Sequence, residues 1–510
     1  MREIRRIQGG DKGGTSYDTS GGPAGGIYGG RHFGPNELSG SGRHHSEIRG
    51  QASDQSGYHT YSYLAPSEIG IDGLRTEVWV TTSGGMAHHP YLFFGTVRNG
   101  RVVGRSLATV LDNSHQDAGR TRVISPVKDA IITAHEESLR FESFSADAGV
   151  YARLDVDSDM LYGDITGMGA TSMDALPGFR SRLKSIVGNF VLAVGTSDGP
   201  RSGERWTKVV ALPSPWLRGL SEAGVIASAS VLEFELSGAQ GRQALHSLVR
   251  HSGAHGLAGL RMVAGRPVVT TAGAVEGLPI ACPKRLEPLL SILPDVESVR
   301  IYSHRHHGSE DLATVSFVLD LDGVSITWML SADHTVGFTG DRDALDALVN
   351  VHPDVLSDVD PFLTNQYYLS ESSFSRALGI SHRDAIDIIA ALAASGRAGY
   401  DLTAQSFFQR DLPFPDVGKT QARLVEARRL VDAGAISSRG SVLRVSQGSV
   451  TNRVTRDAGG FACTCSVDAR TSDLCDHVIA VKYWEVHPRG ETRPYEEAES
   501  TPIAVWGGGR

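Results

Sequence analysis

The sequence predicts an α+β protein of several domains, and three observations lead to this prediction. Apolar and polar residues alternate with period two over many short stretches from about residue 74 onward, which is typical of half-buried strands. Two helical patterns followed by a strand pair occupy residues 365–415. Three of the four cysteines fall within a window of 13 residues near the C-terminus. Because the chain has so few cysteines, this clustering indicates a metal site rather than a disulfide framework.

Length and composition set the broad class. At 510 residues the chain is too long for one simple core, so two to four domains are expected. No apolar run approaches the ~20 residues that span a bilayer, so no membrane segment is expected. The basic N-terminus has no apolar stretch behind it and does not resemble a signal peptide. We therefore expect a cytoplasmic protein.

The first segment, residues 1–62, is rich in glycine, with fifteen glycines in the first sixty residues. Such a stretch has too little apolar surface to offset the entropy lost on ordering, so a disordered arm is expected.

Residues 63–290 are predicted to form a mixed α+β N-terminal domain. Period-two patterns predict strands at 77–80, 91–94, 139–144 and 150–156, and a strand pair at 189–194 and 208–212. Short helices are expected at 127–136, 216–222 and 242–249.

Residues 291–360 are predicted to be an acidic α+β module with a β-hairpin. Apolar residues alternate from Val315 to Leu319 and again from Val324 to Leu330, and Asp322-Gly323 supplies the tight turn between them. Residues 301–360 hold eleven Asp and Glu against two arginines, which accounts for the whole net charge of −9.

Residues 361–440 are predicted to form a winged-helix-like module. One helix, 371–378, ends at Gly379, and the next begins at Ser381 with Asp384 three residues later, as in a capping box. That second helix carries an apolar stripe, and residues 400–414 are expected to form the two strands of a wing. A further amphipathic helix is expected at 421–433, with Leu424, Leu430 and Val431 facing inward and Arg423, Arg428 and Arg429 facing outward.

Residues 441–490 are predicted to be a ββα zinc finger, followed by a tail, 491–510. A hairpin turning at Gln447-Gly448 leads to the pair Cys463 and Cys465, and Cys475 and His477 lie at the entry of a helix, 475–485. Three thiolates and one imidazole are ligands that Zn²⁺ prefers in a closed tetrahedral site. We therefore predict one structural zinc ion bound by four protein ligands: Cys463, Cys465, Cys475 and His477. The N-terminus of the helix is expected to favour Cys475 as thiolate.

The C-x-C…C-x-H pattern, with an apolar helix after the histidine, resembles the SWIM zinc finger of bacterial proteins. The resemblance extends upstream to segments 399–414 and 140–155 and covers about residues 85–488. At one position it departs, because Asp147-Ala148 stand where a Cys-Cys pair is expected. The resemblance implies a partner of the AAA ATPase or von Willebrand A-domain kind, and it leaves both protein and DNA binding open.

Other patterns are weaker. Gly195, Ser197 and Gly199 match the G-x-S-x-G spacing, but the helix that a nucleophile elbow requires does not follow. We therefore expect neither an enzyme nor a small-molecule substrate. His304, His306 and His307, with Glu310 and Asp311 after them, are expected to form an exposed loop, and whether they bind a second metal is left open.

Two functions follow from these observations. The first is a protein-interaction adaptor, because the charge is near neutral around both C-terminal modules. The second is DNA binding through the finger and the winged helix, with contacts from Arg423, Arg428, Arg429, Arg453 and Arg456.

Overall fold

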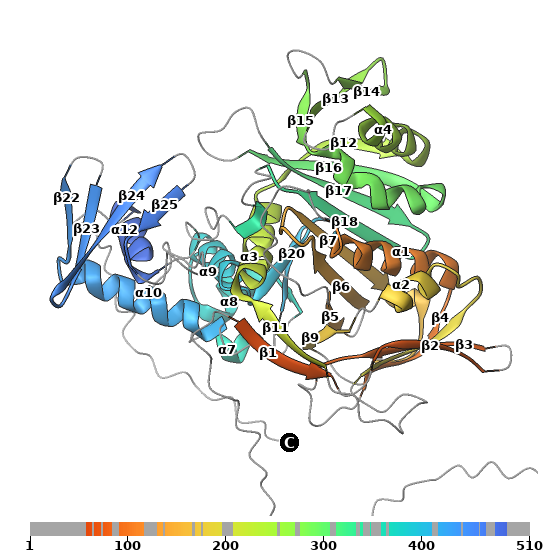
Figure 1. Cartoon of the computed structure of the whole chain (residues 1–510), viewed down its shortest axis with the longest axis horizontal. Helices are drawn as coiled ribbons and strands as arrows, with labels where there is room; N and C mark the ends of the chain where they lie inside the picture. The colour runs from red at the N-terminus through yellow and green to blue at the C-terminus, as the bar shows by residue number, and fades with distance from the viewer. Residues whose placement is uncertain are drawn as a thin grey trace, which may run out of the picture. The chain divides into compact units, whose positions relative to one another are not determined.

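An antiparallel sheet of eight strands forms the centre of the structure, which is a computed structural model (Figure 1). The residues that it describes are 58–63, 66–72, 75–83, 91–116, 130–135, 138–165, 169–174, 177–195, 208–251, 256–270, 276–305, 313–332, 337–339, 347, 359–363, 367–410, 417–439, 442–457, 460–465 and 475–486. The strands follow the order β12-β16-β17-β18-β7-β6-β5-β9. Their bounds are β5 Ala130–His135, β6 Ser138–Phe144, β7 Val150–Asp157, β9 Gly169–Met173, β12 Val231–Ser237, β16 Val296–Arg305, β17 Ala313–Leu321 and β18 Val324–Leu330.

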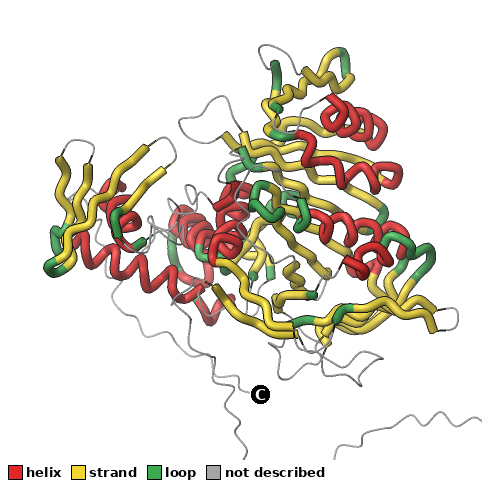
Figure 2. The backbone as a smooth tube through the Cα atoms, in the orientation of Figure 1, coloured by secondary structure: helices red, strands yellow, loops and turns green. Residues whose placement is uncertain are grey.

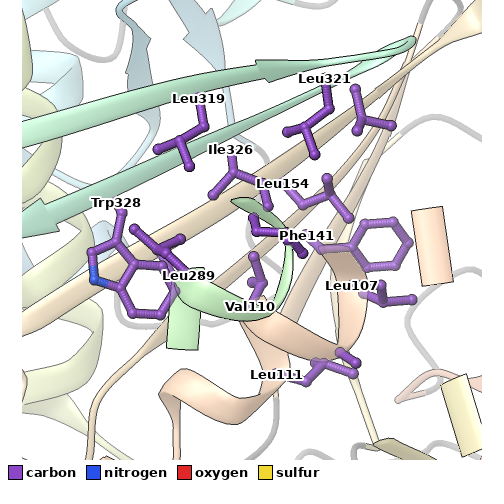
Figure 3. Close-up of a cluster of buried hydrophobic side chains, with 14 of the residues drawn as sticks. Leu107, Val110, Leu111, Phe141, Leu154, Leu289, Leu319, Leu321, Ile326 and Trp328 are labelled. Atoms are coloured by element: carbon purple, nitrogen blue, oxygen red, sulfur yellow. The ribbon is translucent and has the colours of Figure 1, made fainter. Parts of the chain in front are cut away.

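One face of this sheet packs against helices and carries the main hydrophobic core. The helices are α1 (Gly100–Asn113), α4 (Gly238–His251) and the 3-10 helix η2 (Pro283–Ser291). Figure 3 shows Phe141 and Leu154 of neighbouring strands next to Leu107 of α1. Because each such side chain contributes about 1.5–3 kcal/mol on full burial, this face accounts for much of the stability of the domain.

The opposite face is also covered. Helix α3 (Ser214–Ser228) places Leu220, Ala223 and Ile226 in one buried cluster with Tyr151 and Val318 of the sheet. Helices therefore lie on both sides of the central strands (Figure 2).

A second sheet of five strands has the order β2-β3-β10-β4-β8, in which β10 runs parallel to β3. Its strands are β2 Glu68–Asp72, β3 Arg75–Thr81, β4 Tyr91–Val97, β8 Leu161–Ile165 and β10 Phe190–Gly195, and helix α2 (Pro177–Leu183) contacts β2. Smaller elements are the pair β1 (Tyr58–Tyr63) and β11 (Lys208–Pro213), the sheet of β13 Leu257–Val263, β14 Arg266–Thr270 and β15 Leu278–Ala281, and the 3-10 turns η1 Ser158–Met160, η3 Leu293–Asp295 and η4 Gly337–Thr339.

The helical module downstream contains α7 (Asp360–Leu363), α8 (Glu371–Leu378) and α9 (His382–Ala394), with a sheet of β19 Tyr368–Leu369, β21 Ser406–Gln409 and β20 Ala398–Asp401. Both predicted helix boundaries are confirmed. Gly379 ends α8 with φ +67°, and the Ser381 hydroxyl accepts a hydrogen bond from the Asp384 N–H at 3.1 Å. The predicted strand pair is present as β20 and β21, whereas the winged-helix assignment stays a prediction.

The C-terminal elements are helix α10 (Val417–Asp432), the sheet β22 (Ile436–Arg439), β23 (Val442–Gln447), β24 (Val450–Asp457) and β25 (Gly460–Cys463), and helix α12 (Asp476–Val486). Leu430 of α10, Val445 of β23 and Val481 of α12 belong to one buried cluster. Of the inward residues predicted on α10, Leu430 is buried and Val431 half-buried, and the Leu424 side chain lies outside the described residues. The helix before the finger thus contributes to the core of the finger.

Several expectations are corrected. Residues 130–135 form a strand instead of a helix, because β5 pairs with β6 on one side and β9 on the other. Ile131 and Ile132 are buried in different clusters, so both faces are apolar, and such a strand resembles a helix segment in sequence. The strands at 190–195 and 208–213 do not pair with each other: β10 lies between β3 and β4, and β11 pairs with β1.

Two domain boundaries also look different in the structure. Residues 58–62 belong to strand β1 instead of a disordered arm, and residues 1–57 lie outside the described residues. The predicted hairpin at 315–330 is confirmed, with Gly323 at φ +73°, but β18 pairs with β7. The segment that begins at residue 291 therefore shares one sheet with the N-terminal domain.

Candidate metal centre

The four predicted ligands lie together at one end of the C-terminal sheet. The ligand atoms of Cys463, Cys465, Cys475 and His477 are all within 4.8 Å of one another. Cys463, Cys475 and His477 are buried, and Cys465 is more accessible. Among the residues that the structure describes, no second group of three or more such side chains comes this close. The arrangement is compatible with one bound metal ion.

The first cysteine pair is positioned by the end of the β24–β25 hairpin. Cys463 lies opposite Val454 in the strand register. The next residue, Thr464, donates its N–H to the Arg453 carbonyl at 3.0 Å, and its hydroxyl accepts the Arg453 N–H at 2.9 Å. These two bonds extend the pairing of β24 and β25 past Cys463, so that Cys465, two residues later, lies on the same side of the hairpin as Cys463. A hydrogen bond from the Cys465 N–H reaches Cys463.

The second pair lies at the start of α12. The Cys475 carbonyl accepts the N–H groups of Val478 at 3.0 Å and Ile479 at 3.1 Å, which makes Cys475 the N-cap residue of the helix. His477 follows within the first turn. Two residues of one helical turn therefore face the two residues of the hairpin.

One residue that supports the site has no counterpart in the sequence prediction. The Asn452 side-chain amide lies 3.0 Å from His477 Nε2, and both residues are buried. The other ring nitrogen, Nδ1, has no hydrogen-bond partner among the described residues and is therefore the candidate ligand atom. Asn452 and Val454 lie two residues apart on the inner face of β24, where an apolar residue is usual. A polar residue at such a position was the one sequence signal for this contact.

The electrostatics of the site favour a cation. Burial is the largest cause that raises the pKa of the Cys463 thiol and that of the Cys475 thiol. The sulfur groups of Cys463 and Cys465 raise the pKa of Cys475 further, whereas for Cys463 the Cys465 sulfur raises the pKa and the Cys475 thiol lowers it. The Val478 N–H lowers the pKa of Cys475, but burial outweighs it, so the helix N-terminus alone does not produce the predicted thiolate. Burial also lowers the pKa of His477, which keeps the imidazole neutral and able to bind a metal. A divalent cation supplies the charge that three adjacent thiolates need.

Most of the other candidates from the sequence lie outside the described residues. His304 lies on β16, whereas His306, His307, Glu310 and Asp311 are outside the described residues. Gly195 ends β10, and Ser197 and Gly199 of the G-x-S-x-G pattern are likewise outside them.

Two segments far apart in sequence, on β6–β7 and on β20–β21, meet in a buried ion-pair network. Arg140 on β6 contacts Asp155 at 2.5 Å and Asp401 on β20 at 2.8 Å. Arg153 on β7 contacts the same two carboxylates at 2.7 and 3.0 Å. Segments about 260 residues apart in sequence are thus joined through the shared carboxylate of Asp401.

A second part of this network surrounds Glu142. Its carboxylate accepts hydrogen bonds from Arg410 Nη2 at 2.5 Å and from the Tyr151 hydroxyl at 2.5 Å. The Phe408 ring lies 3.6 Å from the Arg140 guanidinium carbon. Burial alone would raise the pKa of Glu142, but Arg410 and Arg140 hold it below its usual range. The network contains three arginines and three carboxylates, so its charges balance.

Asp147, at the turn between β6 and β7, is held by several buried partners. Arg285 pairs with the buried Asp147 carboxylate, which in addition accepts the Ser145 hydroxyl at 2.6 Å and the Gly149 N–H at 3.1 Å. Burial by itself would raise the pKa of Asp147, but these partners hold it below its usual value. The carboxylate therefore organises the turn between β6 and β7.

Comparisons with known proteins do not identify a family. No family model matches the chain, and no curated protein matches its sequence. Among solved structures, proliferating cell nuclear antigen of Entamoeba histolytica aligns over 48% of this chain and 99% of its own, with 10% sequence identity and a TM-score of 0.30. In the part of the chain that the structure describes, no helix combines the length and apolar character needed to cross a bilayer.

Proposed function

We propose that this protein is a non-enzymatic adaptor whose C-terminal module, a finger of the SWIM type, is folded by one structural zinc ion. The observation that carries the proposal is the closed set of Cys463, Cys465, Cys475 and His477, whose ligand atoms lie within 4.8 Å. Three sulfurs and one imidazole nitrogen suit tetrahedral Zn²⁺ and fill all four positions, so none is left for water or substrate. Bound zinc neutralises the thiolates and ties the β24–β25 hairpin to α12.

A structural role fits the way the module is built. The cysteines belong to the same buried cluster as Val454 and Val478, so the metal extends a small apolar core. Small domains of this kind depend on a metal because their apolar burial is limited. We infer that the module is ordered in the zinc-bound chain and loosened without the ion.

A protein partner is the function that the surroundings of the site support best. Two of the arginines proposed for DNA contacts are already paired within α10: Arg428 with Asp432 at 3.6 Å and Arg429 with Glu426 at 2.7 Å. Helix α9, the second helix of the predicted winged helix, packs against α3, and its exposed residues His382, Arg383 and Asp384 carry mixed charge that poorly complements phosphates. These observations weaken the case for DNA binding, which is the alternative. An AAA ATPase or von Willebrand A-domain partner follows from the family resemblance only.

The zinc assignment is tested by metal analysis of the purified full chain. We expect one zinc per chain for the unchanged protein and for Cys282→Ser, a matched control at a buried cysteine outside the cluster. Cys475→Ser is expected to lose the ion and to accelerate amide exchange in residues 442–457 while exchange in β6 and β7 stays slow. One zinc per chain retained in Cys475→Ser, or none in the unchanged protein, would refute the assignment.

The adaptor role is tested separately by affinity capture of the zinc-loaded chain from nuclease-treated and untreated extract. A stoichiometric protein that remains after nuclease treatment supports the proposal. Recovery of nucleic acid alone, with no stable protein, contradicts it and favours the alternative.

A further inference from the structure

Two arginines face each other on the outer surface of the C-terminal sheet. In the register of β23 and β24, Arg444 lies directly opposite Arg453, and both side chains are exposed. Side chains at such positions have Cβ atoms about 5 Å apart, and like charges there destabilise the hairpin.

The opposite face of the sheet explains why these arginines stay outside. Leu443, Val445 and Val454 alternate with them along the two strands and are buried in the cluster shared with α12. A one-residue shift of register that moved the arginines away from each other would expose this apolar set. The juxtaposition is therefore built into the fold of the module.

The neighbours of the two arginines are hydroxyl groups. By strand register the same face carries Ser437, Ser446, Thr451 and Thr455. The Ser446 and Thr451 hydroxyls lie 3.2 Å apart, next to the arginine pair. The register also places Arg439 of β22 and Asp457 of β24 at outward positions of this sheet, and the side chains of both lie outside the described residues; no other Asp or Glu occupies an outward position. The described side chains of this face thus present the positive charges of Arg444 and Arg453 flanked by hydroxyl groups.

The pairing of Arg428 and Arg429 with acidic residues on α10 makes the contrast clear. No ion pair of Arg444 or Arg453 is found among the described residues, although each guanidinium offers a planar fork of donors that matches a carboxylate. A destabilising pair of this kind is explained when a ligand compensates its charge.

We propose that this face, defined by Arg444 and Arg453 with the flanking serines and threonines, docks a carboxylate-bearing segment of a protein partner. The inference rests on the adaptor function proposed above and names the chemistry of its partner. An acidic peptide is favoured over nucleic acid because two neighbouring guanidinium forks match one or two carboxylates, whereas affinity for a phosphate backbone depends on many such contacts.

The test is a fluorescence-anisotropy titration of the zinc-loaded full chain with a labelled peptide of consecutive glutamates and, separately, with labelled oligothymidylate. The double variant R444Q/R453Q removes the charges and keeps polar side chains of similar reach. The matched control R428Q/R429Q removes two arginines of the same module that already have acidic partners. We expect each outer arginine to contribute roughly fivefold to peptide affinity at low salt, so the double variant binds at least ~10-fold more weakly and the control is unchanged.

Zinc content measured on the same samples separates this proposal from the preceding one. Because the arginines point away from the metal, R444Q/R453Q is expected to keep one zinc per chain. Peptide binding that persists in R444Q/R453Q, or that falls equally in the control, overturns the docking face. Binding of oligothymidylate with a steep salt dependence and no peptide binding overturns it in favour of nucleic acid. Absence of both with one zinc bound overturns the docking face and leaves the zinc assignment intact.

Discussion

Replacing Glu142 by glutamine tests whether the buried ion-pair network holds the β19–β21 sheet against β6 and β7. The substitution keeps the size and shape of the side chain and removes only its charge. The Tyr151 hydroxyl, 2.5 Å away, retains an acceptor in the glutamine oxygen. Arg410, in contrast, loses the carboxylate that it contacts at 2.5 and 3.3 Å and remains buried.

The expected magnitude follows from this uncompensated charge. Glu142 is 0% exposed and Arg410 is 2% exposed, so water does not replace the lost partner. Breaking a buried ion pair by removing one partner costs about 3–5 kcal/mol. That is a large share of the roughly 5–15 kcal/mol by which a domain is stable. We therefore expect Glu142→Gln to destabilise the contact between the two segments by about 3 kcal/mol or more.

Native-state hydrogen exchange measures this effect locally. Peptides that cover β20 and β21 are expected to exchange at least about 100-fold faster in Glu142→Gln. Peptides that cover β23 and β24 serve as an internal reference, because no residue of the network lies in them. The double variant E142Q/R410Q, which restores charge balance, is expected to recover most of the protection.

The matched control is Arg429→Gln, which breaks an exposed ion pair and is expected to cost no more than about 1 kcal/mol. Exchange in β20 and β21 that changes less than about fivefold in Glu142→Gln would refute the reasoning, since the network would then contribute no more than a surface pair. An effect spread equally over β23 and β24 would also contradict it, because it would indicate global unfolding in place of local release.

Three further predictions concern other residues. Asn452→Ala is expected to weaken zinc affinity about 10- to 100-fold, as measured by competition with a chelator, because His477 loses the group that orients its ring; unchanged affinity would exclude that role. The pKa values of Glu142, Asp401 and Asp147 are lowered by their arginine partners. The contribution of these carboxylates to stability is therefore present above about pH 4 and is lost as the pH falls below it. Urea midpoints between pH 5 and 3 measure this loss, which is expected to be smaller in Glu142→Gln. Arg453→Thr is expected to raise the thermal midpoint of the zinc-loaded chain slightly at low salt, by relieving about 0.2–1 kcal/mol of repulsion, and the gain is expected to vanish in ~1 M salt.

The grouping of the four candidate ligands was predictable because the residues of each pair are close in sequence. Cys463 and Cys465 lie two residues apart at the end of a hairpin, and Cys475 and His477 lie two residues apart in the first turn of a helix. Such short spacings place side chains on one side regardless of the rest of the fold. Asn452 was missed because its contact with His477 spans 25 residues and depends on how β24 packs against α12.

The buried network shows the opposite case. The alternation of Leu139, Arg140, Phe141 and Glu142 correctly predicts a strand, and the period of two places the two polar residues on one face. The sequence near these residues does not indicate which part of the chain covers that face. In a solvent-facing strand Arg140 and Glu142 would be exposed, yet both are buried, with Asp401 of β20 and Arg410, which directly follows β21, as partners.

The sequence by itself therefore determined the features whose partners are near neighbours in the chain: the pairing of the candidate metal ligands, the caps at Gly379 and Ser381, and the turn at Gly323. Only the tertiary structure decided which strands pair across long intervals, that residues 130–135 form a strand within the central sheet, and that the polar face of β6 and β7 is buried. The physical reason is that backbone geometry and capping act over a few residues, whereas burial and charge compensation depend on which distant surface closes over a side chain.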